Sequence, residues 1–256
     1  MNFRLQAFRS GLPALVPERL NDLMHDTRVF ALKKDDTATT AGIMDGRIFG
    51  LSDPVWVKRF NFRGLWKFVV KRVFGSRARR LYKVSRQLIE KGLPVPQPLY
   101  YIEPSFKEKD SFYICTVIDN AENLHELFAR GLLKENREIL HALARAMARW
   151  HLAGAVHGDM KWPNILLRKG KEGYSVFFVD LDQSRLYGAP SVKGIEKDLK
   201  RFFRFGIEVG SEGLVDTGFF PEYMKSIPES LRHSIDLERV KQHAYRQWQK
   251  KGQKRL

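Results

Sequence analysis

A short segment in the second half of the chain combines residue types that suit the transfer of a phosphoryl group. It runs from His157 to Leu166 and contains Asp159, Lys161 and, five residues after the aspartate, Asn164. Phosphoryl transfer needs an acceptor hydroxyl held in line, a carboxylate that takes its proton, and a cation that bridges the nucleotide phosphates. We therefore interpret Asp159 as the proton acceptor and Lys161 as a positive charge near the transferred group.

A second apolar run supplies another carboxylate. Residues Val176–Val179 form this run, and Asp180 follows it directly. The intervening segment contains Gly170, Gly173 and several charged residues, which is typical of an exposed hairpin turn. Such a hairpin would bring Asn164 and Asp180 side by side, as shared ligands of one Mg²⁺ require. The alternative is an ordinary turn before a strand, which would have to produce all of these spacings by chance.

An upstream lysine is a candidate for contact with nucleotide phosphates. Lys58 lies in the β-type run Pro54–Phe60, like the strand lysine of phosphotransferases. The plain alternative is a solvated lysine on a basic strand. The usual partner of such a lysine is a glutamate on the next helix, which we expect over Arg77–Ile89. That segment has no acidic residue, and Leu81 stands where the glutamate would align.

The loop that would cover the phosphates is poorly marked. Two turn-like segments, Asp35–Thr40 and Met44–Arg47, are candidates. Neither carries the G-x-G-x-x-G pattern of glycine-rich phosphate loops. The sequence therefore leaves the position of this loop open.

The order of the expected elements predicts an α+β chain with two lobes. Residues 1–118 alternate strand-like runs with one or two helices, which predicts a small β-rich N-terminal lobe. Residues 119–256 are mostly helical apart from the catalytic hairpin, which predicts a helical C-terminal lobe. Gly92–Pro98 is a rigid break, and Phe112–Ile118 reads as a buried strand at the junction. A long helix over Glu135–Leu152 leads into the catalytic segment.

Composition narrows the class of partner. Among 256 residues, 45 are Lys or Arg and 29 are Asp or Glu, for a net charge of +16. Such a charge implies attraction to a polyanion.

The single cysteine, Cys115, excludes an internal disulfide framework and fits a reducing cytoplasm. No apolar run approaches the roughly 20 residues of a membrane-spanning helix, and arginines interrupt Met1–Arg9 where a secretory signal would need an apolar stretch.

Two segments combine basic and apolar residues. Between Pro54 and Ile89 there are eleven Lys or Arg residues and no acidic one. Within this segment, Phe62–Val73 has apolar residues at helical spacing on one side and a stripe of basic residues on the opposite side. Such an amphipathic helix suits the surface of an anionic membrane. The alternative is a helix packed on the small lobe with a solvated basic face.

The second segment is an expected C-terminal helix over Ile235–Lys250. Its apolar stripe consists of Leu237, Val240, Ala244 and Trp248, and it continues into a basic tail. Packing of the stripe in the core with a solvated tail is one interpretation, and contact with lipid phosphates is the other.

The motifs resemble those of the bacterial lipopolysaccharide core kinases, which belong to the protein-kinase-like superfamily. The resemblance covers residues 50–210, approximately, and depends on His157–Leu167, on Val179–Asp182 and on the Gly92–Pro96 break. Asp182 departs from the glycine that protein kinases place two residues after the metal-binding aspartate. The resemblance implies a bilobal protein-kinase-like fold and phosphorylation of a Kdo or heptose sugar of the inner core by ATP.

By that resemblance, Asp159 is the base, Asn164 and Asp180 hold Mg²⁺, and Lys58 contacts the ATP phosphates. The implied acceptor is the core oligosaccharide on lipid A. The implied location is cytoplasmic, peripheral on the anionic cytoplasmic face of the inner membrane. We expect no nucleic-acid partner, and the sequence leaves the oligomeric state open.

The segment after Asp180 argues against a protein acceptor. Protein kinases follow their metal-binding aspartate with a long segment that ends in Ala-Pro-Glu and forms a platform for the peptide. This chain lacks that ending and proceeds quickly to a helical pattern over Ile195–Ile207. Asp198 in that helix either buttresses the catalytic loop by hydrogen bonds or is a plain surface acid.

Two alternatives stand beside the leading interpretation. One is another kinase-like phosphotransferase that acts on a protein or on a small cationic antibiotic, although a cationic substrate needs an acidic pocket and the net charge is +16. The other is a basic nucleic-acid-binding module on a decayed kinase fold. The complete set of Asp159, Asn164 and Asp180 argues against decay, which normally removes one of these residues.

Overall fold

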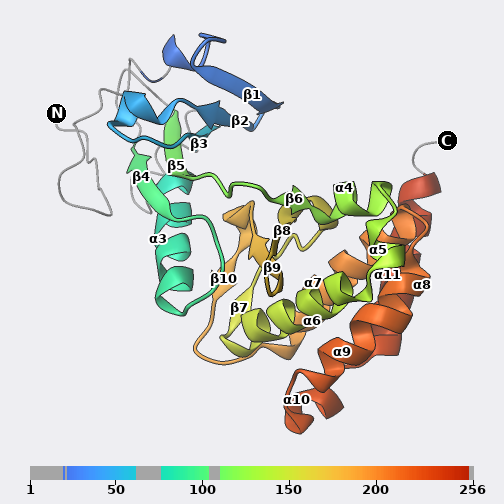
Figure 1. The fold of residues 1–256 in the computed structure, drawn as a ribbon. Helices are drawn as coiled ribbons and strands as arrows, with labels where there is room; N and C mark the ends of the chain where they lie inside the picture. The colour runs from blue at the N-terminus through green and yellow to red at the C-terminus, as the bar shows by residue number, and fades with distance from the viewer. Residues whose placement is uncertain (1–19, 21, 62–75, 104–109, 254–256) are drawn as a thin grey trace. The chain divides into compact units, whose positions relative to one another are not determined.

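The chain forms two compact units in the computed structural model, which describes residues 20, 22–61, 76–103 and 110–253. The first unit comprises Met1–Ile89 and Pro96–Ile118, and the second comprises Glu90–Val95 and Asp119–Leu256 (Figure 1). The expected amphipathic segment Phe62–Val73 and the N-terminal segment Met1–Arg9 lie outside the described residues.

The first unit contains an antiparallel sheet of five strands in the order β1-β2-β3-β5-β4. The strands are β1 (Phe30–Asp35), β2 (Thr39–Met44), β3 (Val55–Phe60), β4 (Pro98–Ile102) and β5 (Ser111–Thr116). A short helix, η1 (Gly46–Phe49), follows β2. The predicted strands over Pro54–Phe60 and Phe112–Ile118 are therefore confirmed as β3 and β5, with bounds shifted by one or two residues.

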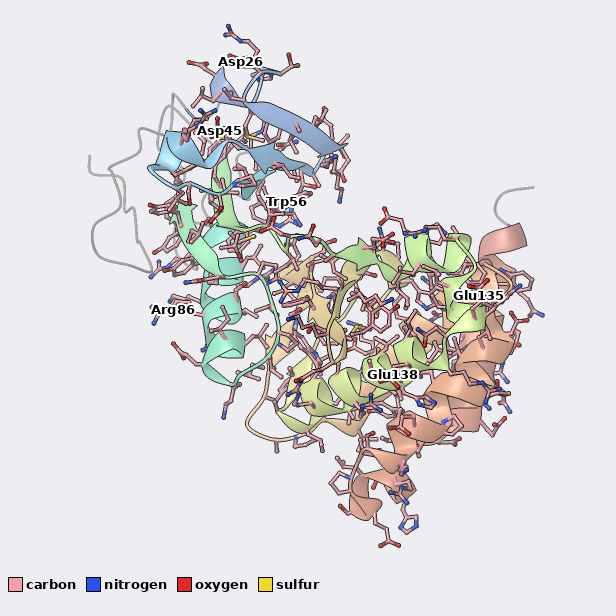
Figure 2. The ribbon with its side chains drawn as sticks, viewed as in Figure 1. Asp26, Asp45, Trp56, Arg86, Glu135 and Glu138 are labelled. Carbon is pink, nitrogen blue, oxygen red and sulfur yellow. The ribbon has the colours of Figure 1, made fainter. Side chains whose placement is uncertain are left out.

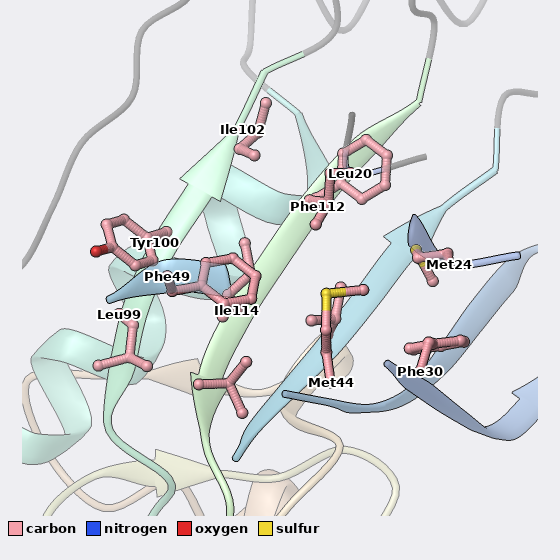
Figure 3. Close-up of a cluster of buried hydrophobic side chains, with 12 residues drawn as sticks. Leu20, Met24, Phe30, Met44, Phe49, Leu99, Tyr100, Ile102, Phe112 and Ile114 are labelled. Carbon is pink, nitrogen blue, oxygen red and sulfur yellow. The ribbon is translucent and has the colours of Figure 1, made fainter. Parts of the chain in front are cut away.

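Apolar side chains of this sheet and of the segment before it form one buried cluster (Figure 3). Its members are Leu20, Met24, Phe30, Met44, Phe49, Val55, Val57, Leu99, Tyr100, Ile102, Phe112 and Ile114. In β3, residues Val55 and Val57 alternate with the half-buried Trp56, as expected for a strand with one face in the core. Burial of apolar surface on this scale is the main force that holds the sheet together.

Helix α3 (Arg77–Glu90) belongs to the same region of the chain and confirms the predicted helix over Arg77–Ile89. Its buried side includes Leu81 and Ser85, and the Tyr113 hydroxyl on β5 lies 3.1 Å from the Ser85 hydroxyl. The exposed side is basic and includes Arg86 (Figure 2). Gly92 has φ +68°, the left-handed conformation that ends a helix, and it stands where the sequence predicted the stop.

The second unit is mostly helical. Its longer helices are α4 (Leu124–Ala129), α6 (Arg137–Leu152), α7 (Val192–Glu208), α9 (Phe220–Lys225), α10 (Glu229–Ser234) and α11 (Leu237–Gln253). Shorter ones are α5 (Leu132–Glu135), η2 (Trp162–Asn164), η3 (Leu181–Gln183), α8 (Glu212–Leu214) and the π-helical η4 (Val215–Phe219). Strands β6 (Glu122–Asn123), β8 (Ile165–Gly170) and β9 (Gly173–Phe178) form one sheet, and β7 (Ala155–Val156) pairs with β10 (Arg185–Leu186).

The helix predicted over Glu135–Leu152 is divided in the structure. The Asn136 side chain accepts a hydrogen bond from the Glu138 backbone N–H and caps α6, so α5 ends at Glu135 before α6 begins. Asparagine favours such a cap because its side chain replaces the missing helical acceptor. Glu138 (Figure 2) also forms an ion pair of 2.9 Å with Arg145 two turns later.

Helix α11 packs beside α7 in the second unit (Figure 1). Val240 and Ala244 of the predicted apolar stripe are buried, whereas Trp248 keeps 42% of its surface exposed. The core interpretation of that stripe is therefore correct for its first turns and wrong for Trp248. No helix of the described chain is long and apolar enough to cross a membrane.

Candidate active site

The catalytic segment follows β7 and is fixed by a buried carboxylate from α7. Asp198 Oδ2 accepts a hydrogen bond of 2.6 Å from the His157 backbone N–H, and Oδ1 accepts one of 2.8 Å from that of Gly158. The Asp198 side chain has no exposed surface. The hypothesis that Asp198 buttresses the catalytic loop is thus confirmed, and the alternative of a surface acid is wrong.

A second layer lies behind Asp198. His151, at the end of α6, is buried, and its Nδ1 lies 2.8 Å from the Tyr223 hydroxyl on α9. Its Nε2 lies 3.5 Å from Asp198 Oδ2. Three helices of the second unit therefore meet behind the loop, and His151 lies between Tyr223 on α9 and Asp198 on α7.

Gly158 allows the loop to turn toward Asp198. Its φ of +82° is unfavourable for residues with a side chain, and an added Cβ would lie 2.8 Å from the Gln183 carbonyl oxygen. The Ser184 hydroxyl donates a hydrogen bond of 3.2 Å to the His157 carbonyl. This hydrogen bond, together with the close approach at Gly158, holds the loop against the chain segment that follows Asp180.

His157 links the loop to the end of β9. Its Nε2 lies 2.9 Å from the Val179 carbonyl, and because a carbonyl only accepts, Nε2 must carry a proton. Its Nδ1 accepts a hydrogen bond of 3.3 Å from the Asp159 backbone N–H, which fits a neutral ring. The ring thereby holds the peptide before Asp180, whose φ of +60° is rare for a residue other than glycine.

The predicted hairpin brings the two candidate metal ligands together. Strands β8 and β9 are antiparallel, with Ile165 opposite Phe178, and the Val179 N–H donates to the Asn164 carbonyl at 3.0 Å. Asn164 and the residue before Asp180 are therefore direct neighbours, which confirms the hairpin. The Asn164 Nδ2 donates to the Asp159 carbonyl at 3.0 Å, an orientation that leaves its Oδ1 for another donor or a cation.

Asp159 lies among cationic groups. Arg201 Nε donates a hydrogen bond of 2.8 Å to its Oδ1, and Lys161 Nζ lies 3.3 Å from its Oδ2. Partial burial raises the pKa of Asp159, but the charges of Arg201 and Lys161 outweigh that effect, and the pKa lies below the ordinary value of 3.8. Asp159 is therefore ionised near neutral pH, as a proton acceptor must be.

Arg201 contacts Asp159 from outside the sequence motifs. It lies on α7, 42 residues after Asp159, so no local motif includes it. One signal was available, because residues three apart on a helix share a face. Once Asp198 is placed against the loop, Arg201 is expected on the same side of α7, one turn later.

Aromatic rings pack around Trp162, which lies in the loop between Lys161 and Asn164. Trp162 is fully buried, and its ring centroid lies 5.8 Å from those of both Phe202 and Phe205 on α7. Phe128 on α4 contacts the same ring edge-on at 5.6 Å. The short helix η2, which ends at Asn164, is therefore anchored by a large apolar contact.

Lys58 belongs to the first unit and is described there. It is 6% exposed on β3, with Ala41 and Tyr113 as its cross-strand neighbours. Its ammonium lies 5.5 Å from the centre of the Phe60 ring. Leu81, at the position of the usual glutamate, is buried, so α3 is held by apolar packing and by the Tyr113–Ser85 contact.

The two candidate phosphate loops differ in structure. Asp36 lies in the turn between β1 and β2, where its Oδ1 accepts hydrogen bonds from the Ala38 and Thr39 backbone N–H groups. The other candidate spans the end of β2 and the start of η1, where Asp45 accepts from the Arg47 N–H. Of the two candidates, only Asp35–Thr40 therefore contains the tight turn of a β-hairpin. A phosphate-covering loop is expected in such a turn between two strands.

The architecture matches a known class. A solved structure described as WaaP in complex with acyl carrier protein aligns with 93% of this chain and 98% of that chain, with a TM-score of 0.59 and 17% sequence identity. The fold is α+β and protein-kinase-like, with an antiparallel sheet in the first unit and helices in the second, as the sequence predicted.

Within this class, residues 61–215 match the lipopolysaccharide kinase (Kdo/WaaP) family. The chain belongs to that family. A 3-deoxy-D-manno-octulosonic acid kinase of Xanthomonas oryzae pv. oryzae (strain PXO99A) is 29% identical over 142 residues, which are 56% of this chain and 53% of that protein. The corresponding kinase of Xylella fastidiosa (strain M12) is 29% identical over 169 residues, 64% and 61% of the two chains. The chain thus matches between half and two thirds of the length of these relatives.

Proposed function

We propose that this chain is an ATP-dependent kinase that phosphorylates a sugar of the lipopolysaccharide inner core, with Kdo as the favoured acceptor and heptose as the alternative. The observation that carries the proposal is the arrangement of Asp159, Asn164 and Asp180 around one loop and one hairpin, in a chain of the lipopolysaccharide kinase family. The names of the relatives support Kdo as the acceptor.

Asp159 is the proposed base. Its carboxylate is ionised and held by charge-assisted contacts, and each carboxylate oxygen has two acceptor sites. Oδ1 therefore keeps one site for the acceptor hydroxyl after it binds Arg201. Lys161, whose side chain is 30% exposed, supplies positive charge for the transferred phosphoryl group.

Asn164 and Asp180 are the proposed Mg²⁺ ligands. Amide and carboxylate oxygens suit this hard cation, which is commonly held by one or two protein groups together with substrate phosphates. The described residues contain no group of three His, Cys, Asp or Glu side chains that could hold a metal alone. A two-ligand site that depends on the nucleotide fits the donors present, and Mg²⁺ would neutralise phosphate charge during transfer.

Residues 1–118 form the proposed nucleotide-covering lobe, and residues 119–256 form the proposed catalytic lobe. Lys58 would contact the ATP phosphates. The buried position of its side chain on β3 supports a directed role over that of a solvated surface lysine.

The net charge of +16 supports a peripheral position on the anionic cytoplasmic face of the inner membrane, where a lipid-linked acceptor would be presented. In the C-terminal helix, Tyr245 and Trp248 are 38% and 42% exposed. Such aromatic side chains favour the interface between water and lipid.

The deciding experiment is transfer of ³²P from Mg·ATP to lipopolysaccharide purified from a strain that lacks this chain. We expect label in the core sugar fraction with the intact protein and none with Asp159→Ala. ATP binding without transfer would indicate another acceptor, such as a protein or a small molecule. Failure to bind ATP would overturn the proposal in favour of a decayed kinase fold.

A further inference from the structure

Arg201 has more binding capacity than its contact with Asp159 uses. A guanidinium group has five N–H donors in a planar fork, and only the Nε–H of Arg201 has a partner within the described part of the chain. The side chain is 28% exposed. Its terminal N–H groups are therefore available to a ligand that approaches the base.

Two cationic side chains contact the single carboxylate of Asp159. Its single carboxylate lies within 3.3 Å of the lysine ammonium and within 2.8 Å of the arginine guanidinium. The nearby Asp198 carboxylate is fully buried and accepts two backbone N–H groups. Asp159 thus has two cationic partners, and the terminal N–H groups of Arg201 at the partly exposed edge of the loop can bind a second anion.

The surface of α7 extends this positive charge away from the base. Lys193 and Lys197 precede Arg201 at intervals of four residues, so the three side chains share one face. Both lysines are exposed, and neither forms an ion pair among the residues that the structure describes. Arg204, one turn further along the helix, differs from these lysines because it contacts Glu208 at 3.4 Å and Gln247 at 3.1 Å.

An aromatic side chain continues the same face in the other direction. Phe205 follows Arg201 by four residues and is half-buried against the Trp162 ring. The exposed His125 ring of α4 meets Phe205 edge-on, with 5.4 Å between the ring centres. A ligand at Arg201 would thus have apolar ring surface on one side and lysines on the other.

We propose that Arg201, with Lys197 one turn before it, binds the carboxylate of a sugar-acid acceptor and determines specificity for it. This inference rests on the proposed function. The two terminal nitrogens of an arginine match the two oxygens of a carboxylate, which gives such pairs both strength and orientation. The same guanidinium binds Asp159 through Nε, so a bound acid group is placed at a fixed position relative to the base.

The test compares an acceptor that carries the free acid with its methyl ester, which removes the charge and keeps the sugar. Arg201→Gln should lower kcat/KM for both acceptors because Arg201 also holds Asp159, but we expect the loss for the acid to exceed the loss for the ester by roughly 10- to 100-fold. The preference for acid over ester should therefore nearly disappear. Arg201→Lys should recover part of it, because a lysine keeps the charge but loses the planar fork.

Arg204→Gln is the matched control, because it removes the same charge from the same helix one turn away. We expect it to leave the preference for the acid unchanged. An equal loss on acid and ester in Arg201→Gln would overturn the inference, because it would show that Arg201 only positions Asp159. An equal effect of Arg204→Gln would also overturn it, since charge on α7 in general would then be responsible.

Calorimetric titration of the full chain with the free sugar acid, without ATP, separates this inference from the proposed function. Binding by the wild type that Arg201→Gln weakens, in a protein that transfers no phosphate to lipopolysaccharide, would refute the kinase proposal and leave the acid site standing. Neither binding nor transfer would overturn both. Binding that is equal for the acid and the ester would overturn the acid site alone.

Discussion

At the scale of single residues, the carboxylate of Asp159 depends on three neighbouring donors. Arg201 and Lys161 hold its two oxygens, and the Asn164 side-chain amide lies 3.4 Å from Oδ2. Each donor comes from a different part of the second unit, from α7, from the loop itself and from η2. The geometry of the base is therefore a property of the folded unit and not of the loop sequence alone.

Removal of this carboxylate should affect turnover and spare nucleotide binding. We expect Asp159→Ala to lower kcat roughly 10²- to 10⁴-fold, the usual contribution of a positioned base. The dissociation constant for Mg·ATP should change little, because the proposed role of Asp159 is on the acceptor side. Steady-state kinetics and calorimetry with ATP measure the two quantities. A large loss of ATP affinity would contradict this assignment.

Asp180 should behave in the opposite way. Asp180→Ala removes the only carboxylate of the proposed metal pair, so we expect weaker binding of ATP in the presence of Mg²⁺ and a smaller dependence of that binding on Mg²⁺ concentration. Asp182→Ala, two residues along the chain, is the control. Equal Mg²⁺ dependence in the wild type and in Asp180→Ala would exclude Asp180 as a ligand.

The pH dependence of the reaction should report the charge of Arg201. Because the pKa of Asp159 is lowered in the folded protein, the base stays ionised as the pH falls, and its ion pairs are lost only when the pH passes through that lowered value. Arg201→Gln removes a positive charge that lowers the pKa of Asp159. The acid limb of kcat/KM should therefore move to higher pH, whereas Arg204→Gln should leave it in place. If the acid limb of kcat/KM in Arg201→Gln kept its position or moved to lower pH, Arg201 would not lower the pKa of Asp159.

At the scale of elements, the catalytic loop is held by α7 through Asp198. Removing one partner from a buried network of charged hydrogen bonds costs about 3–5 kcal/mol. We expect Asp198→Ala to lower the free energy of unfolding by that order, together with activity, in urea denaturation. Glu229→Ala is the control, because Glu229 is 80% exposed on α10 and its change should not alter the urea midpoint. An Asp198→Ala protein of normal stability would show that the loop is held in another way.

Elements with a strong local signal were predictable. The period of apolar residues in α3 and α7, the glycines of the β8–β9 turn and the apolar run of β5 all lie within short windows of sequence. The hairpin then brings Asn164 and Asp180 close together, because the register of the antiparallel strands β8 and β9 determines which residues lie opposite each other.

Contacts between distant segments were not predictable in the same way. The pairing of Arg201 with Asp159 and of His151 with Tyr223 joins residues 42 and 72 positions apart. No single sequence pattern spans such intervals. The cap at Asn136 was a local signal, but the apolar period continued across it and hid the division between α5 and α6.

At the scale of the whole molecule, charge should govern association with membranes. With a net charge of +16, the chain should float with vesicles that contain anionic lipid and not with neutral ones, and added salt should release it. Trp248→Ala should reduce the bound fraction if the C-terminal helix contacts lipid. Tyr187→Ala is the control, because Tyr187 is 43% exposed on another segment. Equal flotation with neutral and anionic vesicles would contradict an electrostatic attachment.

Helix α7 carries Asp198 and Arg201 on the same side, one turn apart. This spacing sets the angle between the direction of Asp198, which binds the loop backbone, and that of Arg201, which binds Asp159. Each residue of an α-helix turns the direction of its side chain by about 100°. An insertion or deletion of one residue between these positions would rotate Arg201 off the edge of Asp159 while Asp198 stayed in place. The three-residue interval between these two side chains therefore has to keep its length for both contacts to form.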